Sequence, residues 1–132
     1  MMAGPNGAAE CRRLFVYGML RRGFELHHHL ARLGARFRSE AKVAARLVDG
    51  GRYAGARPSD RKGNWVRGEL FELRQSAHDL RVLDKVEGLI PGAPERSEFV
   101  RALTEVILNN GSRQQAWIYW LGAGRSTGDS HG

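Results

Sequence analysis

The chain has 132 residues, of which 42% are hydrophobic and 27% are charged, and it carries a formal net charge of +7. This length provides for one domain with a core of its own, and it leaves no room for a second. No apolar run is long enough to span a membrane, and Cys11 is the single cysteine, which excludes an internal disulfide. The first residues also lack a secretory signal. We therefore expect a cytoplasmic protein.

The positive charge comes mostly from arginine and is spread along the chain without a run of five basic residues. A basic surface can attract nucleic acid, or it can accompany a small anionic ligand. No basic helix, zinc finger or paired-aromatic RNA-binding motif is visible. The spacing therefore favours the small ligand, and we do not expect nucleic acid or a membrane as a partner.

The first predicted element follows a loose leader of residues 1–11, where glycine, proline and asparagine discourage regular structure. Leu14–Tyr17 is a short apolar and aromatic run that predicts a buried strand, and Gly18 ends it in a turn. A helix is predicted over Glu25–Leu33, with an apolar face formed by Phe24, Leu26, Leu30 and Leu33 and an end at Gly34.

The middle of the chain changes to strand-like alternation over Ala35–Val48, followed by a short extended piece around Tyr53. Trp65–Leu73 predicts another strand. Ser76–Val86 has the apolar spacing of a second helix, with Ser76 as its expected N-terminal cap.

The last predicted elements are two strands, Phe99–Leu108 and Gln114–Leu121, joined by a hairpin turn at Asn109–Gly111. Several antiparallel strands with two helices in one small chain predict an α+β protein with a curled sheet or small barrel. We expect one domain between flexible tails, with the domain at 12–122 and the tails at 1–11 and 123–132.

A carboxylate, Glu87, lies where the second predicted helix ends. Gly88 can end the helix in a left-handed conformation, so Glu87 meets the negative end of the helix dipole. The apolar neighbours Leu83, Val86 and nearby Leu89 and Ile90 also disfavour its charged form, which makes it a candidate general acid or base. The alternative is a solvated glutamate at a helix end.

A second informative stretch is the turn Tyr17–Gly23, which has a glycine near each end. In such turns successive backbone N–H groups can point at one anion, and Arg21 or Arg22 can add charge-assisted hydrogen bonds. No Lys-Ser/Thr pair follows, which excludes a P-loop nucleotide triphosphatase. The alternative is a tight strand-to-helix turn with no ligand.

Four stretches in order resemble the γ-glutamylcyclotransferase-like superfamily, which includes AIG2-like proteins. Leu14–Gly23 (LFVYGMLRRG) is similar to its opening motif, and Val66–Leu73 (VRGELFEL) to its central strand. Leu83–Gly88 (LDKVEG) is similar to its catalytic-glutamate motif, and Phe99–Arg101 to its aromatic-X-arginine strand. The chain departs from the family pattern at Met19, where a small hydroxyl residue is usual, and at Phe99, which replaces a tyrosine.

The resemblance implies a small mixed β-barrel with flanking helices and an enzyme that releases 5-oxoproline from a γ-glutamyl amine or peptide. It implies that Glu87 is the acid/base and that backbone amides of Gly18, Met19 and Leu20 hold the substrate carboxylate. No metal or organic cofactor is implied. The pocket residues expected from this resemblance and from the turn are Tyr17, Gly18, Met19, Leu20, Arg21, Tyr53 and Tyr119.

Two further groups of polar residues have competing interpretations. Asp84 lies three residues before Glu87 on the same helical face, where it could raise the pKa of Glu87 or hydrogen-bond nearby backbone amides. Consecutive histidines at 27–29 point about 100° apart on a helix and cannot converge on one metal ion. A non-catalytic module that binds an anionic small molecule remains the alternative function, and we expect a monomer or weak homodimer.

Overall fold

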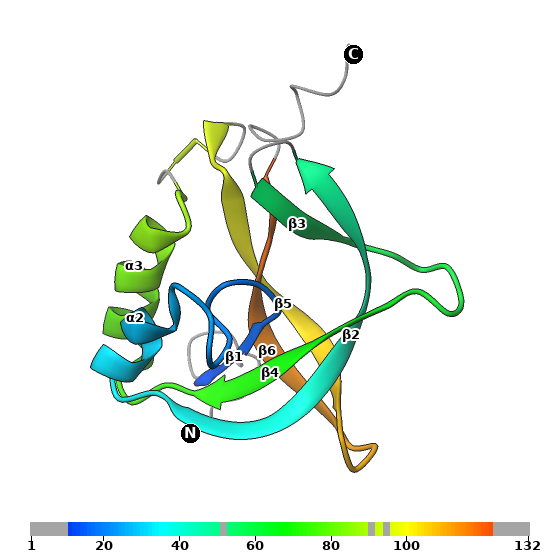
Figure 1. Cartoon of the computed structure of the whole chain (residues 1–132), viewed down its shortest axis with the longest axis horizontal. Coiled ribbons are helices and arrows are strands. Elements are labelled where there is room, and N and C mark those ends of the chain that lie inside the picture. Colours follow the sequence, from blue (N-terminus) through cyan, green and yellow to red (C-terminus); the bar gives the residue numbers. More distant parts are fainter. Residues whose placement is uncertain (1–10, 51–52, 90–91, 94–95, 123–132) are drawn as a thin grey trace, which may run out of the picture.

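The computed structural model describes residues 11–50, 53–89, 92–93 and 96–122 (Figure 1). The side chains of residues 49, 50, 53 and 54 lie outside this described part. Its elements, in chain order, are β1 (Arg13–Val16), α2 (His27–Arg32), β2 (Arg36–Gly50), β3 (Tyr53–Pro58), β4 (Trp65–Glu72), α3 (Ser76–Val86), β5 (Phe99–Leu108) and β6 (Arg113–Leu121).

Five strands close into a barrel in the order β2-β4-β1-β6-β5, with β5 pairing back onto β2 (Figure 1). β1 and β6 are parallel and the other neighbours are antiparallel, so the sheet is mixed. The long β2 pairs with β5 at Ala41–Val43 and with β3 at Ala45–Gly50. The predicted α+β fold, a small mixed barrel with flanking helices, is confirmed.

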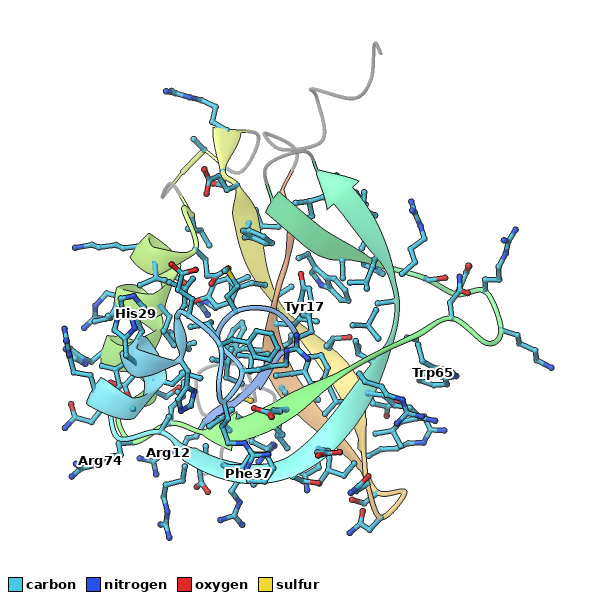
Figure 2. All side chains as sticks on the ribbon, viewed as in Figure 1. Arg12, Tyr17, His29, Phe37, Trp65 and Arg74 are labelled. Carbon is cyan, nitrogen blue, oxygen red and sulfur yellow. The ribbon has the colours of Figure 1, made fainter. Side chains whose placement is uncertain are left out.

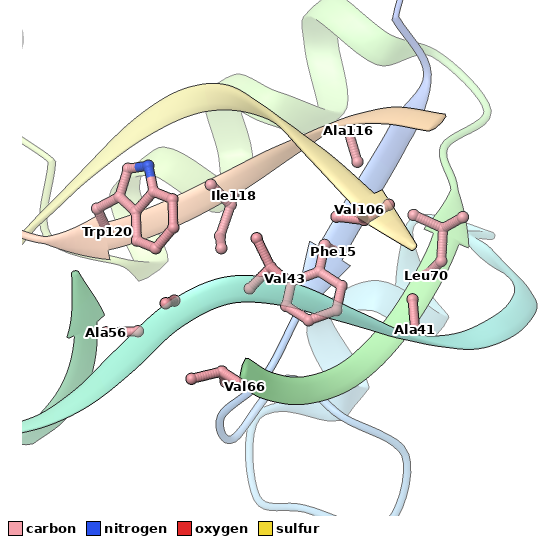
Figure 3. Close-up of a cluster of buried hydrophobic side chains, with 11 residues drawn as sticks. Phe15, Ala41, Val43, Ala56, Val66, Leu70, Val106, Ala116, Ile118 and Trp120 are labelled. Carbon is pink, nitrogen blue, oxygen red and sulfur yellow. The ribbon is translucent and has the colours of Figure 1, made fainter. Parts of the chain in front are cut away.

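Alternating residues of the strands fill the barrel interior (Figure 3). β6 is typical, because Ala116, Ile118 and Trp120 point inward while Trp117 and Tyr119 point outward. Small alanines on β2, β3 and β6 leave space for Phe15 and Trp120, as close packing requires. The interior side chains are Phe15, Ala41, Val43, Ala45, Ala56, Val66, Leu70, Val106, Ala116, Ile118 and Trp120.

Both helices cover the same side of the barrel (Figure 1). Leu30 of α2 and Leu80 and Leu83 of α3 are buried against the outward residues of β1, including Leu14. β1 is therefore buried on both faces, which explains its uninterrupted apolar run. In the described residues neither helix has the length and apolar character needed to cross a bilayer.

The helix bounds test two local predictions. α3 spans the predicted residues, but its cap is Gln75. The Ser76 hydroxyl instead donates to the carbonyl of Cys11 at 2.7 Å, while the Asp79 carboxylate accepts the N–H of Gln75 at 3.0 Å. The prediction of Ser76 as the cap was therefore wrong, because its hydroxyl bonds to Cys11, which lies shortly before β1.

The first predicted helix, Glu25–Leu33, is shorter than expected and contains only α2, His27–Arg32. The residues before it form consecutive turns, held where the N–H of Leu26 donates to the carbonyl of Met19 at 2.9 Å. Cys11, which was assigned to the leader, is buried at 6% exposure.

Candidate active site

The C-terminal end of α3 has the backbone form that its glycine predicted. Gly88 has φ of +71°, its N–H donates to the carbonyl of Lys85, and the N–H of Leu89 donates to the carbonyl of Asp84. These two bonds form a Schellman motif, which satisfies the last carbonyl groups of the helix. Glu87 is the C-terminal cap residue, and the motif fixes the direction in which its side chain leaves the helix.

Glu87 lines a cavity of about 330 Å³ between the barrel and the helix end. Tyr17, which follows β1, lines this cavity, and Figure 2 shows it near the middle of the molecule. The cavity is bounded by the end of β1, by the turn that follows it, by the end of α3 and by the start of β5. Its lining residues are Phe15, Val16, Tyr17, Gly18, Met19, Leu20, Arg21, Phe24, Leu26, Val86, Glu87, Glu98, Phe99 and Tyr119.

The turn after β1 contributes successive backbone N–H groups to this region. Within the described residues, the N–H groups of Gly18, Met19 and Leu20 donate to no protein acceptor. The next N–H, of Arg22, donates to Glu69 of β4 at 2.9 Å, and the Arg22 side chain also pairs with that carboxylate. The turn is therefore anchored to the barrel beside three donors that a ligand can use.

The environment of Glu87 disfavours its charged form. Burial raises the pKa of its carboxyl to about 7, and the negative charge of Glu98 adds to the shift. The side chain nevertheless keeps partial exposure at the cavity, so a ligand can reach it. The raised pKa was predicted, although the repelling carboxylate is Glu98 and not Asp84, and Ile90 lies outside the described residues.

Asp84 has a partner that neither of its predicted interpretations included. Its carboxylate accepts two hydrogen bonds from the guanidinium of Arg101 at 2.8 and 3.1 Å, and one from the hydroxyl of Tyr119 at 2.6 Å. These bonds join α3 to β5 and β6. The predicted bonds from Asp84 to backbone amides are thus replaced by a side-chain network, which also balances its negative charge.

The two tyrosines of the cavity use their hydroxyl groups inside the protein. The Tyr17 hydroxyl donates to the carbonyl of Tyr119 at 2.7 Å and accepts the N–H of Ala56 at 3.0 Å. Burial raises the pKa of both tyrosine hydroxyls, and the bond to Asp84 raises that of Tyr119 further. Tyr17 and Tyr119 therefore present ring surface to the cavity while their hydroxyls hold strands and helix together.

The structure gathers most of the predicted pocket residues around one cavity. Glu87, Tyr17, Tyr119 and Arg21 all line it, together with the predicted turn residues 18–20. The side chain of the remaining candidate, Tyr53, lies outside the described residues.

The sequence interpretation did not assign seven of the lining residues to the pocket: Phe15, Val16, Phe24, Leu26, Val86, Glu98 and Phe99. Phe24 directly follows Gly23 of the turn and was assigned to the apolar face of a helix. Glu98 directly precedes a predicted strand, so its position beside Phe99 was the available signal.

A second cavity, of about 240 Å³, is lined by residues of β2 and β4, by the end of β5 and by the turn that follows it. Lys42, Arg67 and Glu40 line it, and Glu40 is exposed there. Its carboxylate is open to solvent, whereas Glu87 lies among the apolar residues of the first cavity. The chemistry of the site therefore points to the first cavity.

Comparison with protein families gives a match over most of the chain. Residues 14–131 match the family model described as gamma-glutamyl cyclotransferase, AIG2-like. A Drosophila melanogaster protein, whose name describes it provisionally as a gamma-glutamylcyclotransferase, is 31% identical over 118 residues. The aligned part is 83% of this chain and 69% of the fly protein.

Solved structures with the same fold include YkqA from Bacillus subtilis, with a TM-score of 0.64 and 22% identity over 83% of this chain and 35% of YkqA. An AIG2-like protein from Mus musculus has a TM-score of 0.63 and 24% identity, and the match covers 85% of this chain and 78% of the mouse protein. At these identities the likeness shows the fold. The chain spans about a third of YkqA.

Proposed function

The chain belongs to the gamma-glutamyl cyclotransferase, AIG2-like family, and we propose that it releases 5-oxoproline from a small γ-glutamyl amine or peptide, with Glu87 as the general acid/base. One observation carries the proposal. A partly exposed carboxyl with a pKa of about 7 shares a cavity with three turn residues whose backbone N–H groups have no acceptor in the described part of the chain.

The proposed reaction is an internal acyl transfer. The α-amine nitrogen of the γ-glutamyl group attacks its own γ-carbonyl carbon, a new C–N bond closes the five-membered lactam, and the C–N bond to the departing amine breaks. Glu87 takes a proton from the attacking nitrogen and gives one to the departing nitrogen, so protons balance and no water is consumed. A carboxyl with a pKa near neutrality suits both transfers.

The turn after β1 supports this proposal by binding and positioning. In our proposal the N–H groups of Gly18, Met19 and Leu20 hold the substrate carboxylate, which bends the γ-glutamyl chain toward the cyclic conformer. Because the reaction is intramolecular, fixing that conformer can supply much of the acceleration. Glu69 stabilises the turn through Arg22, outside the cavity lining.

The proposal is tested by incubating the protein with a panel of γ-glutamyl dipeptides, γ-glutamyl amines and glutathione, and by measuring 5-oxoproline by mass spectrometry. Glu87→Gln should keep its thermal unfolding transition and lose about a thousandfold in turnover, the size of a general acid/base contribution. Glu40→Gln, which changes an exposed carboxyl of the second cavity, is the matched control and should retain full turnover.

A folded Glu87→Gln protein with turnover near that of the unchanged protein would contradict the proposal. Binding of panel members without any product would favour the alternative, a non-catalytic module for small anionic molecules.

The pH dependence of the same assay gives an independent check. Glu87 must be deprotonated to accept a proton, so kcat/KM should rise with pH and show a break near pH 7. The α-amine of the substrate adds its own rise at higher pH. The break near pH 7 should be missing from the residual activity of Glu87→Gln, and a break that persists in this variant belongs to another group.

A further inference from the structure

The mouth of the Glu87 cavity is formed by large apolar side chains that remain exposed. Met19 and Phe24 line the cavity and are each 47% exposed, whereas Leu20 and Val16 on the same lining are buried at 4% and 3%. Exposed apolar residues that border one pocket commonly contact a ligand. The exposure gradient therefore separates a closed floor from an open apolar mouth.

The polar groups of the cavity dictate which end of a γ-glutamyl substrate faces the floor. In the function proposed above, the substrate carboxylate meets the N–H groups of Gly18, Met19 and Leu20, and the scissile bond meets Glu87. These groups then bind the γ-glutamyl part of the substrate, and the departing amine extends toward the mouth of the cavity. There its neighbours are the exposed side chains of Met19 and Phe24, and the partly buried Phe99 also lines the cavity.

Two charged side chains of the lining other than Glu87 are engaged by the protein itself. The Arg21 guanidinium lies 4.1 Å over the ring of Phe24, and its Nε donates to the carbonyl of Gly18 at 3.0 Å. Glu98 rests against the end of α3, where a methyl group added to Gly88 would come within 2.7 Å of its carboxylate oxygen. Arg21 therefore supports the Phe24 ring, and Glu98 packs on the helix end.

We propose, as a deepening of the proposed function, that the departing group is an apolar amine, and that Met19, Phe24 and Phe99 select it. An alkyl or arylalkyl chain buries apolar surface against these side chains. A charged departing group would lose hydration at the same place while Arg21 and Glu98 are already engaged. The substrates are accordingly γ-glutamyl alkylamides rather than γ-glutamyl conjugates of charged amines.

The test is a series of γ-glutamyl alkylamides from methyl to hexyl, compared with the γ-glutamyl conjugate of 1,5-diaminopentane, whose chain matches hexyl in length but ends in an ammonium. We expect kcat/KM to rise about threefold to fourfold for each added methylene until the mouth is filled. The hexylamide should exceed the diamine conjugate at least tenfold. A preference for the diamine conjugate would overturn the inference, since it would mean that Glu87 and Glu98 attract a cation.

Matched variants locate the effect at the mouth. Met19→Ser and Phe24→Ser keep every backbone N–H and should flatten the dependence on chain length. Leu47→Ser changes an apolar side chain that is 64% exposed and lies outside the cavity lining, so the dependence should stay as it was. Equal slopes in all variants would contradict the assignment of these residues.

Calorimetric binding to the Glu87→Gln protein separates a failure of this inference from a failure of the proposed function. If alkylamides bind more tightly as they lengthen but the unchanged protein forms no 5-oxoproline, the ligand class stands and the reaction does not. If product forms without dependence on chain length, the reaction stands and the ligand class is wrong. Absence of both binding and product would overturn both.

Discussion

The two faces of β6 bury different chemistry. Toward the barrel interior the strand presents Ala116, Ile118 and Trp120, which pack in the hydrophobic core cluster. Toward the helices it presents Trp117 and Tyr119, and there Tyr119 bonds to Asp84 of α3. The interior cluster closes the barrel, whereas the helix-side layer also carries the hydrogen bonds that hold α3, and with it Glu87, against the strands.

The two layers should respond differently to substitution, because one is held by apolar contacts and the other also by hydrogen bonds. Apolar contacts are non-directional, so a core of adequate volume can be rebuilt from many residue combinations. Hydrogen-bonded polar groups in a partly buried layer are directional, and removing one partner leaves the other desolvated. The interior should therefore govern stability, and the helix-side layer should govern both stability and the geometry of the cavity.

The largest expected effect belongs to the interior. Ile118 is fully buried in the barrel and does not line the Glu87 cavity. Ile118→Ala removes buried methyl and methylene groups and leaves a void, which should lower the free energy of unfolding by about 4 kcal/mol in urea titrations. The folded fraction should keep its kcat/KM when assayed well below the midpoint. A selective loss of activity in folded protein would break the separation between the two layers.

A smaller loss is expected from the helix-side network. Arg101→Met leaves the Asp84 carboxylate with only the Tyr119 hydroxyl, in a pair whose side chains are 22% and 15% exposed. Because the pair is partly exposed, the loss should be about 2 kcal/mol, below that of a fully buried pair. Unlike Ile118→Ala, this variant should also lower kcat/KM of the folded protein, because α3 carries Glu87.

Two controls sharpen the Arg101 prediction. Arg113→Met breaks the pair with Glu105, whose side chains are 62% and 55% exposed, and should change stability by less than about 1 kcal/mol. Asp84→Asn added to Arg101→Met removes the uncompensated charge and should restore part of the lost stability. Equal losses in the free energy of unfolding for Arg113→Met and Arg101→Met would show that the helix-side network stabilises the protein no more than an exposed ion pair does.

The interior and α3 could be predicted because both follow local periodicity. Alternation along β2, whose Ala41, Val43 and Ala45 face the interior, and the spacing of Leu80 and Leu83 identify the buried side of each element without knowledge of its neighbour. The end of α3 was also predictable, because Gly88 and the apolar residues around Glu87 act through the local chain.

The partners across elements could not be predicted in the same way. Asp84 and Arg101 are 17 residues apart, and only the packing of α3 on β5 and β6 brings them together. Phe24 matched an apolar helix face, and its place at the cavity depends on the bond from Leu26 to Met19 that folds the turn back. Local patterns report which side of an element is apolar, but not which element covers it.

The smallest effect compares two glycines with left-handed backbone, Gly88 at the end of α3 and Gly111 in the hairpin after β5. Their φ angles are +71° and +88°, and a methyl group at Gly111 would meet nothing, whereas one at Gly88 would crowd the Glu98 side chain. Gly111→Ala should therefore lower the free energy of unfolding by about 1 kcal/mol, the cost of the backbone conformation alone.

Gly88→Ala should lower it by a few tenths to about 1 kcal/mol more, because Glu98 must move. Only this second variant should also shift the pH break assigned to Glu87, since Glu98 contributes to the pKa of that carboxyl. Equal losses of stability and an unmoved break would show that the helix end tolerates displacement of Glu98, and that the geometry around Glu87 is held by the Asp84 network instead.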